Sequence, residues 1–178
     1  QFINRRKTGF RTAPLTIVGP KGLKTFYQRL LKLYYNWTVP TTYRLTLKEV
    51  LESSFKINNL KVTTAEMLHQ KYSVGYRIED ARGKSVVYSG DTEYCQNIVQ
   101  LGRGADVLIL EGSAPDEAAM PYHLSPSTAG RIAREAKPKR LVLTHLYPLC
   151  DEHDMVKEVK RAWPGRVELA SDLKKISL

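Results

Sequence analysis

Residues 85–92 of this chain read SVVYSGDT, a short apolar run that ends in polar residues. Two later stretches have the same form, ADVLILE at residues 105–111 and LVLTH at residues 141–145. Short runs rich in Val, Leu and Ile that close on polar residues are typical of buried β-strands. Segments with helical character separate the three runs. This alternation of strands and helices predicts an α/β fold.

The rest of the chain extends the pattern in both directions. We expect further strands at residues 14–20, 60–69, 73–79, 166–170 and 173–178, and helices at residues 21–35, 93–101, 125–136 and 151–163. Residues 40–59 show no clear pattern. The spacing of the aromatic residues at 26, 27, 34, 35 and 37 favours a core position for them over a role in stacking on bases. No repeat or linker interrupts the chain, so residues 1–178 are predicted to form a single domain.

Composition limits the class of protein. The 178 residues are 42% hydrophobic, which is typical of a globular chain, and no apolar run reaches the roughly 18 residues of a membrane span. Only two cysteines are present, Cys95 and Cys150, so a disulfide or zinc-cysteine framework is excluded and a cytoplasmic protein is expected.

The net charge of +10 is concentrated near the start of the chain. Residues 1–48 hold ten Lys and Arg residues and no acid, while the remainder is neutral. Such a block attracts phosphate-rich partners, because neutralised phosphates release counterions. The alternative is an ordinary solvated basic surface.

Polar residues follow the expected strand ends. Asp91 follows the first run, Glu111 ends the second with His123 in the loop beyond, and His145 ends the third. An aspartate and two histidines brought together from separate strand ends suit a divalent metal. Taken singly, Asp91 could cap the following helix and the histidines could be structural.

These segments together resemble the metallo-β-lactamase superfamily, and within it the ribonuclease Z-like group. The residues that carry the resemblance are Val87–Thr92, Ala105–Glu111, His123–Ser125 and Leu141–His145, with Pro14–Leu23, His69 and Gly75–Glu79 upstream. The resemblance covers nearly the whole chain. It implies a four-layer αββα sandwich, incomplete at its N-terminus, because the family's His-x-His-x-Asp-His motif is absent and the chain begins just after its expected place.

The resemblance also implies roles for single residues. Asp91 matches the aspartate that bridges two divalent ions, usually zinc, with manganese or iron as alternatives. His145 matches a terminal metal ligand. The absent motif supplies most of the other ligands in the family, so the resemblance implies a metal site that is incomplete in this chain. His123 matches the histidine placed over the scissile group, and Glu111 the acid that orients it. The implied reaction is hydrolysis of a phosphodiester by a metal-activated water. His69 is given no role, and Cys150 is expected to be packed and inert.

Two departures bear on the substrate. One tight turn joins residues 77–80 to residues 85–87, which leaves no room for the long tRNA-gripping arm of ribonuclease Z. Residues 146–150 also differ from that enzyme's pattern. An armless phosphodiesterase acting on nucleic acid or a smaller phosphodiester is therefore our first hypothesis, with a homodimer as one option for its assembly. The alternatives are a non-catalytic or truncated member that binds nucleic acid through residues 1–48, and a hydrolase of a non-phosphate ester.

Overall fold

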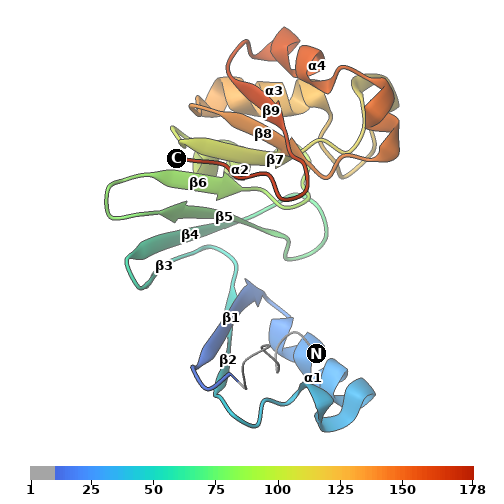
Figure 1. The fold of residues 1–178 in the computed structure, drawn as a ribbon. Helices are drawn as coiled ribbons and strands as arrows, with labels where there is room; N and C mark the ends of the chain where they lie inside the picture. Colours follow the sequence, from blue (N-terminus) through green and yellow to red (C-terminus); the bar gives the residue numbers. More distant parts are fainter. Residues whose placement is uncertain (1–10) are drawn as a thin grey trace. The chain divides into compact units, whose positions relative to one another are not determined.

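The computed structural model describes residues 11–178, and the chain divides into two compact units, residues 1–50 and 51–178 (Figure 1). The assignment of the whole chain to a single domain stays a prediction. Arg5, Arg6 and Lys7 of the basic segment lie outside the described residues. The expected α/β class is confirmed, since helices and strands alternate in both units.

The first unit is a small strand–helix–strand arrangement. Strand β1 (Leu15–Pro20) leads into helix α1 (Leu23–Tyr34) and the short helix η1 (Tyr35–Thr38), and β2 (Leu45–Val50) returns to pair in parallel with β1. The Glu49 carboxylate accepts hydrogen bonds from the amides of Gly22 (2.8 Å) and Lys24 (3.2 Å). These bonds hold the pKa of Glu49 below its usual range and join β2 to the first turn of α1.

The expectation that the aromatic residues of this unit form a core is wrong. No residue of α1 is buried, and the exposed fractions of Phe26, Tyr34 and Trp37 are 63%, 54% and 82%. Among these aromatic residues only Tyr27 is half-buried, and its hydroxyl donates to the Thr38 carbonyl at 3.0 Å. Helical spacing places such residues on a common face, but it does not determine whether another element covers that face.

The second unit is built on one seven-stranded sheet with the strand order β3-β4-β5-β6-β7-β8-β9. The strands are β3 (Ser53–Ile57), β4 (Leu60–Glu66), β5 (Val74–Glu79), β6 (Ser85–Tyr88), β7 (Val107–Glu111), β8 (Leu141–Thr144) and β9 (Val167–Leu169). From β3 to β6 neighbouring strands are antiparallel, and from β6 to β9 they are parallel.

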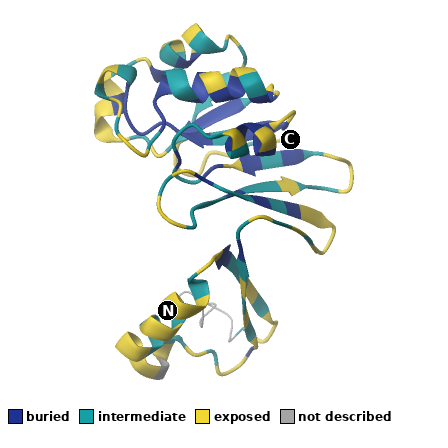
Figure 2. Cartoon of the chain, turned by 180° about the vertical axis from the view of Figure 1, so that it is seen from behind, coloured by how far each residue is buried: buried dark blue, intermediate teal, exposed yellow. Residues whose placement is uncertain are grey.

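Three helices cover one face of this sheet: α2 (Gln96–Gly102), α3 (Pro126–Ala136) and α4 (Met155–Ala162). Their inner sides and strands β7 and β8 contain most of the buried residues (Figure 2). The close approach of α2 needs a residue without a side chain on β5, because a Cβ at Gly75 would lie 3.2 Å from Leu101. Burial of these apolar residues is the main stabilising contribution in this unit.

The other face of the sheet is also apolar. Register places Tyr76 opposite Tyr88 and Ile78 opposite Val86, so these four side chains share a face. The exposed fractions of Ile78 and Tyr88 are 40% and 45%. A sheet that is apolar on both faces is typical of an inner layer of a sandwich.

Several sequence expectations need correction. Residues 173–178 form no strand, and β2 and β3 lie in the stretch without a clear pattern. The helix expected from Asp151 is divided into η3 (Pro148–Glu152) and α4, and the side chain of Asp154 caps α4 by accepting from the Lys157 amide at 2.9 Å. A further short helix, η2 (Asp116–Ala118), precedes α3. Within residues 11–178, no helix has the length and apolar character needed to cross a bilayer.

The contact between α3 and α4 yields a first testable prediction. A Cβ at Gly130 would lie 2.7 Å from the Val159 carbonyl oxygen and 2.9 Å from the Ala162 Cβ. Gly130→Ala should therefore lower the free energy of unfolding by about 1–3 kcal/mol, although alanine is the better helix former by about 1 kcal/mol. Denaturant titration measures this, with Arg134→Ala on the exposed side of α3 as the control. Equal stability of Gly130→Ala and the unchanged protein would contradict the packing described.

Candidate functional site

The parallel half of the sheet brings three predicted site residues to one edge. Strands β6, β7 and β8 run in the same direction, so their carboxyl ends lie together. Asp91 follows β6, Glu111 ends β7, and His145 follows β8. His123 comes from the loop between η2 and the start of α3. All four residues predicted from the sequence therefore belong to one region.

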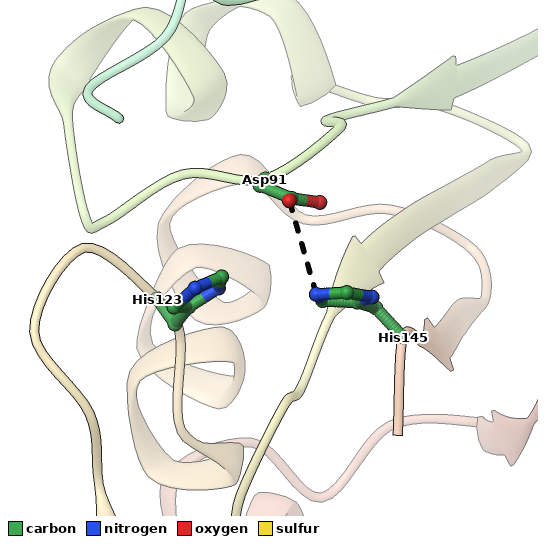
Figure 3. A group of neighbouring side chains, drawn as sticks. All are labelled: Asp91, His123 and His145. Atoms are coloured by element: carbon green, nitrogen blue, oxygen red, sulfur yellow. Dashed lines mark ion pairs between the residues drawn. The ribbon is translucent and has the colours of Figure 1, made fainter. Parts of the chain in front are cut away.

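Asp91, His123 and His145 form a compact cluster (Figure 3). One potential ligand atom from each lies within 4.8 Å of the others. The Asp91 Oδ2 is 3.8 Å from the His145 Nε2, and the centroids of the His123 and His145 rings are 5.6 Å apart. The distance of 3.8 Å between Asp91 and His145 is too long for a direct hydrogen bond. It matches the span of two bonds of about 2 Å from a shared metal ion.

His123 is held by the buried carboxylate of Glu111. The His123 Nδ1 lies 2.8 Å from the Glu111 Oε2, and 1% of the Glu111 residue is exposed. The same carboxylate accepts hydrogen bonds from the Thr92 amide and the Ser113 hydroxyl, each at 2.5 Å. A carboxylate surrounded by donors serves as an acceptor, so the Nδ1 of His123 carries the proton and Nε2 is left for other partners.

His69, which was expected to be able to approach the site through the hairpin but was assigned no role, is a member of the site. Its Nε2 lies 4.0 Å from the Asp91 Oδ2, and its ring centroid is 5.0 Å from that of His123. The His69 Nδ1 donates to the Tyr122 carbonyl at 2.8 Å, which leaves Nε2 facing Asp91. The direction of the strands explains why His69 lies here. Strand β4 runs in the same direction as β6, so the connection from β4 to β5 leaves the sheet at the edge that carries Asp91.

Hydrogen bonds join the loops that carry these residues. The Leu68 amide donates to the Thr92 hydroxyl at 3.1 Å, and the Glu93 amide donates to the Leu68 carbonyl at 2.7 Å. The Tyr122 amide donates to the Glu93 carboxylate at 2.8 Å. The loops of His69, Asp91 and His123 are thereby fixed to one another, which is the preorganisation that a metal or catalytic site needs.

Two residues of the site adopt a left-handed backbone conformation. The φ angles are 58° at His145 and 67° at Tyr122, directly before His123. A non-glycine residue in this region costs roughly 1–2 kcal/mol. Such strain is often found where a side chain must be aimed at a functional site.

The remaining candidates lie elsewhere or have other partners. Asp91 does not cap α2, because that helix begins at Gln96 with Cys95 at the N-cap position. Cys150 is part of the core, its thiol donates to the Ser113 carbonyl at 3.2 Å, and burial raises its pKa. His153 is partly buried and lies 3.7 Å from Glu117 and 3.9 Å from Glu158.

The donor set fits a divalent ion of borderline softness. Imidazole nitrogens with one carboxylate oxygen suit zinc, and they also suit iron or manganese. The hydrogen bond from His69 to a carbonyl is of the kind that fixes a metal-binding imidazole. The histidine and aspartate donors in residues 11–178 fit one ion well, and a second ion would share Asp91.

Comparison with known proteins agrees with the fold. An uncharacterized protein of Mycobacterium leprae (ML1173) is 43% identical over 102 residues, covering 56% of this chain and 36% of that protein. The ribonuclease Z of Bacillus licheniformis is 28% identical over 211 residues, covering 86% of this chain and 68% of the enzyme. The crystal structure of the metallo-β-lactamase fold protein YhfI from Bacillus subtilis is 26% identical with a TM-score of 0.73, covering 89% of this chain and 63% of YhfI. The chain thus spans about a third of the length of the mycobacterial relative it matches.

The hydrogen bonds of Glu111 yield a second prediction. Glu111→Ala leaves the Thr92 amide, the Ser113 hydroxyl and the His123 Nδ1 without their shared acceptor in a buried place. The free energy of unfolding should fall by about 2–4 kcal/mol. Denaturant unfolding measures the change, and Glu117→Gln, whose side chain is largely exposed, should change stability by less than about 0.5 kcal/mol. A decrease no larger than that of the control would mean that Glu111 does not hold this region together.

A family model identifies the superfamily to which this chain belongs. The model described as "Beta-lactamase superfamily domain" matches residues 6–146, which include His69, Asp91, Glu111, His123 and His145. Together with the relatives named above, this confirms the resemblance found in the sequence. The chain belongs to the β-lactamase superfamily, has the metallo-β-lactamase fold, and is related to the ribonuclease Z group of hydrolases.

Proposed function

We propose that this chain carries part of the active site of a metal-dependent phosphodiesterase of the ribonuclease Z-like group. The observation that carries the proposal is the cluster of Asp91, His123 and His145 at the carboxyl ends of parallel strands. Membership of a family of metal-dependent hydrolases supports it. The acid-free first 48 residues favour a phosphate ester over an uncharged ester.

We assign metal binding to His69, Asp91 and His145. The Asp91 Oδ2 lies 4.0 Å from the His69 Nε2 and 3.8 Å from the His145 Nε2. Asp91 has two carboxylate oxygens and one negative charge, so it can join two dications while reducing their mutual repulsion. The cofactor we infer is a pair of divalent ions, with zinc first and manganese or iron as alternatives. When bound, such ions polarise a phosphoryl oxygen and lower the pKa of water.

We assign proton transfer to His123. Glu111 holds the Nδ1 proton of His123, so the Nε2 is the nitrogen that can hydrogen-bond to the departing oxygen of a phosphodiester. The Glu111 carboxylate also fixes the orientation of the His123 ring, since the two groups are 2.8 Å apart and the carboxylate is buried. Glu111 therefore acts through His123 and is a positioning residue.

Substitutions in the full gene product separate these roles. Asp91→Ala should lower both the bound metal and the kcat for bis(p-nitrophenyl) phosphate, the latter by at least about a hundredfold. His123→Ala should lower kcat by about 10²–10⁴-fold and keep the bound metal. Metal content by elemental analysis and steady-state kinetics give the two readings.

His153→Ala is the matched control, because His153 pairs with Glu117 and Glu158 outside the cluster. It should change neither the metal content nor kcat. Unchanged hydrolysis by Asp91→Ala would sink the proposal. Loss of metal from His123→Ala would make His123 a ligand instead of the proton donor.

Nucleic-acid binding by the first unit is a second candidate function. The exposure of Tyr34 and Trp37 favours it, because Arg29 and Lys32 of α1 are also exposed and no acid lies within residues 1–48. Exposed aromatic rings beside cations provide a surface on which single-stranded bases can stack. This activity would position a nucleic-acid substrate or act without turnover.

The salt dependence of binding tests this second function. Replacing Arg29 and Lys32 together with alanine should reduce the slope of log K against log salt for single-stranded RNA by about 1.4, because each phosphate that the protein neutralises adds about 0.7 to that slope. Trp37→Ala should weaken binding without changing the slope. The matched control replaces Lys157 and Lys160, which are exposed on α4. An equal effect of both double variants would indicate non-specific charge attraction.

A further inference from the structure

A cavity of about 330 Å³ lies beside the imidazole of His145. Its lining comes from two loops, one after β8 and one after β9, and consists of Thr144, His145, Leu146, Ala170, Ser171 and Asp172. Strands β8 and β9 are parallel, so both loops leave the sheet at the edge that carries the cluster. The cavity therefore adjoins the proposed reaction centre.

The loop after β9 is fixed in place by backbone hydrogen bonds. The Ala170 amide donates to the Leu143 carbonyl of β8 at 2.7 Å, and the Lys174 amide donates to the Ser171 carbonyl at 3.1 Å. The second bond closes a turn over residues 171–174, with Asp172 inside it. The turn thus has a defined position relative to β8 and to His145.

The carboxylate of Asp172 is not used within the described chain. Among residues 11–178, it has no hydrogen bond or ion pair, and the residue is exposed. Neighbouring Glu168 differs, since Arg140, Arg166 and Lys174 lie within 4 Å of its carboxylate. The residues that line the cavity therefore include one carboxylate without a partner in the described chain and the hydroxyl-bearing Ser171 and Thr144.

The carboxylate and the two hydroxyl-bearing residues determine which kind of ligand the cavity can bind. A carboxylate repels a phosphate, so the cavity does not suit the phosphoryl group itself. A carboxylate accepts two hydrogen bonds from adjacent hydroxyls, as acidic residues do for ribose in nucleotide-binding folds. In RNA, the 2′-hydroxyl is the donor that DNA lacks.

We propose that Asp172, with Ser171 and Thr144, binds the vicinal hydroxyls of a ribose and makes the site selective for ribonucleotide esters over deoxyribonucleotide esters. The inference rests on the phosphodiesterase function proposed above. Asp172 would contact the sugar of the substrate and take no part in bond cleavage. Asp172 thus determines the specificity for the sugar, and it lines the same cavity as His145.

The test uses the full gene product and two substrates with the same leaving group, the p-nitrophenyl esters of uridine and 2′-deoxyuridine 5′-monophosphate. The unchanged protein should prefer the ribose ester in kcat/KM by about tenfold or more, the effect of hydrogen bonds to a charged acceptor. Asp172→Asn should reduce that preference to about twofold or less, through a higher KM for the ribose ester. Both proteins should hydrolyse bis(p-nitrophenyl) phosphate, which has no sugar, at the same rate.

Glu52→Gln is the control, because Glu52 lines a different cavity that contains no residue of the cluster. It should keep the ribose preference. A wild-type protein without ribose preference would overturn the inference, as would equal loss of hydrolysis of all three esters or loss of metal in Asp172→Asn. If no ester is hydrolysed, the proposed function fails. The affinities for uridine and 2′-deoxyuridine 5′-monophosphate, measured by titration with both proteins, would then decide the ribose site alone.

Discussion

The buried carboxylate of Glu111 is the interaction on which the rest of the site depends. It ends β7 and accepts hydrogen bonds from Thr92 in the loop after β6, from Ser113 in the loop after β7, and from His123 before α3. Burying a charge without such partners would cost several kcal/mol. The carboxylate therefore holds three loops together. Their positions at this edge of the sheet are fixed relative to one another.

Strand direction determines which loops can meet there. The parallel strands β6 to β9 deliver Asp91, Glu111, His145 and the turn at Ser171–Lys174 to one edge. The antiparallel hairpin of β4 and β5 returns to the same edge with His69. The helices α2, α3 and α4 cover one face of the sheet and leave this edge free. The site adjoins the apolar core, since Leu124 beside His123 is a core residue and Leu146 beside His145 packs against the core.

Much of this arrangement could be predicted from the sequence, because buried strands and polar strand ends leave a local pattern. Val107–Glu111 and Leu141–Thr144 are examples, and so are Asp91 and His145 after their strands. His69 was assigned no role, because its distance from Asp91 depends on how β4 pairs with β5 and β5 with β6. The exposure of the Trp37 ring and the absence of a strand at residues 173–178 also depend on contacts with distant segments, which a local pattern does not describe. Periodicity shows which side chains share a face. Segments distant in the sequence determine which element covers that face and which strands pair with one another.

The hydrogen bond from His69 to the Tyr122 carbonyl has a consequence for the thermodynamics of folding. Its two residues lie on separate loops, and the cluster they adjoin exists only after the whole sheet has formed. An ion or substrate that binds the assembled cluster therefore favours the native state over the unfolded chain. By mass action, such a ligand adds RT ln(1 + [L]/Kd) to the free energy of unfolding. The melting temperature of this protein is accordingly a measure of site occupancy, and it reports binding even where no catalytic turnover is observed.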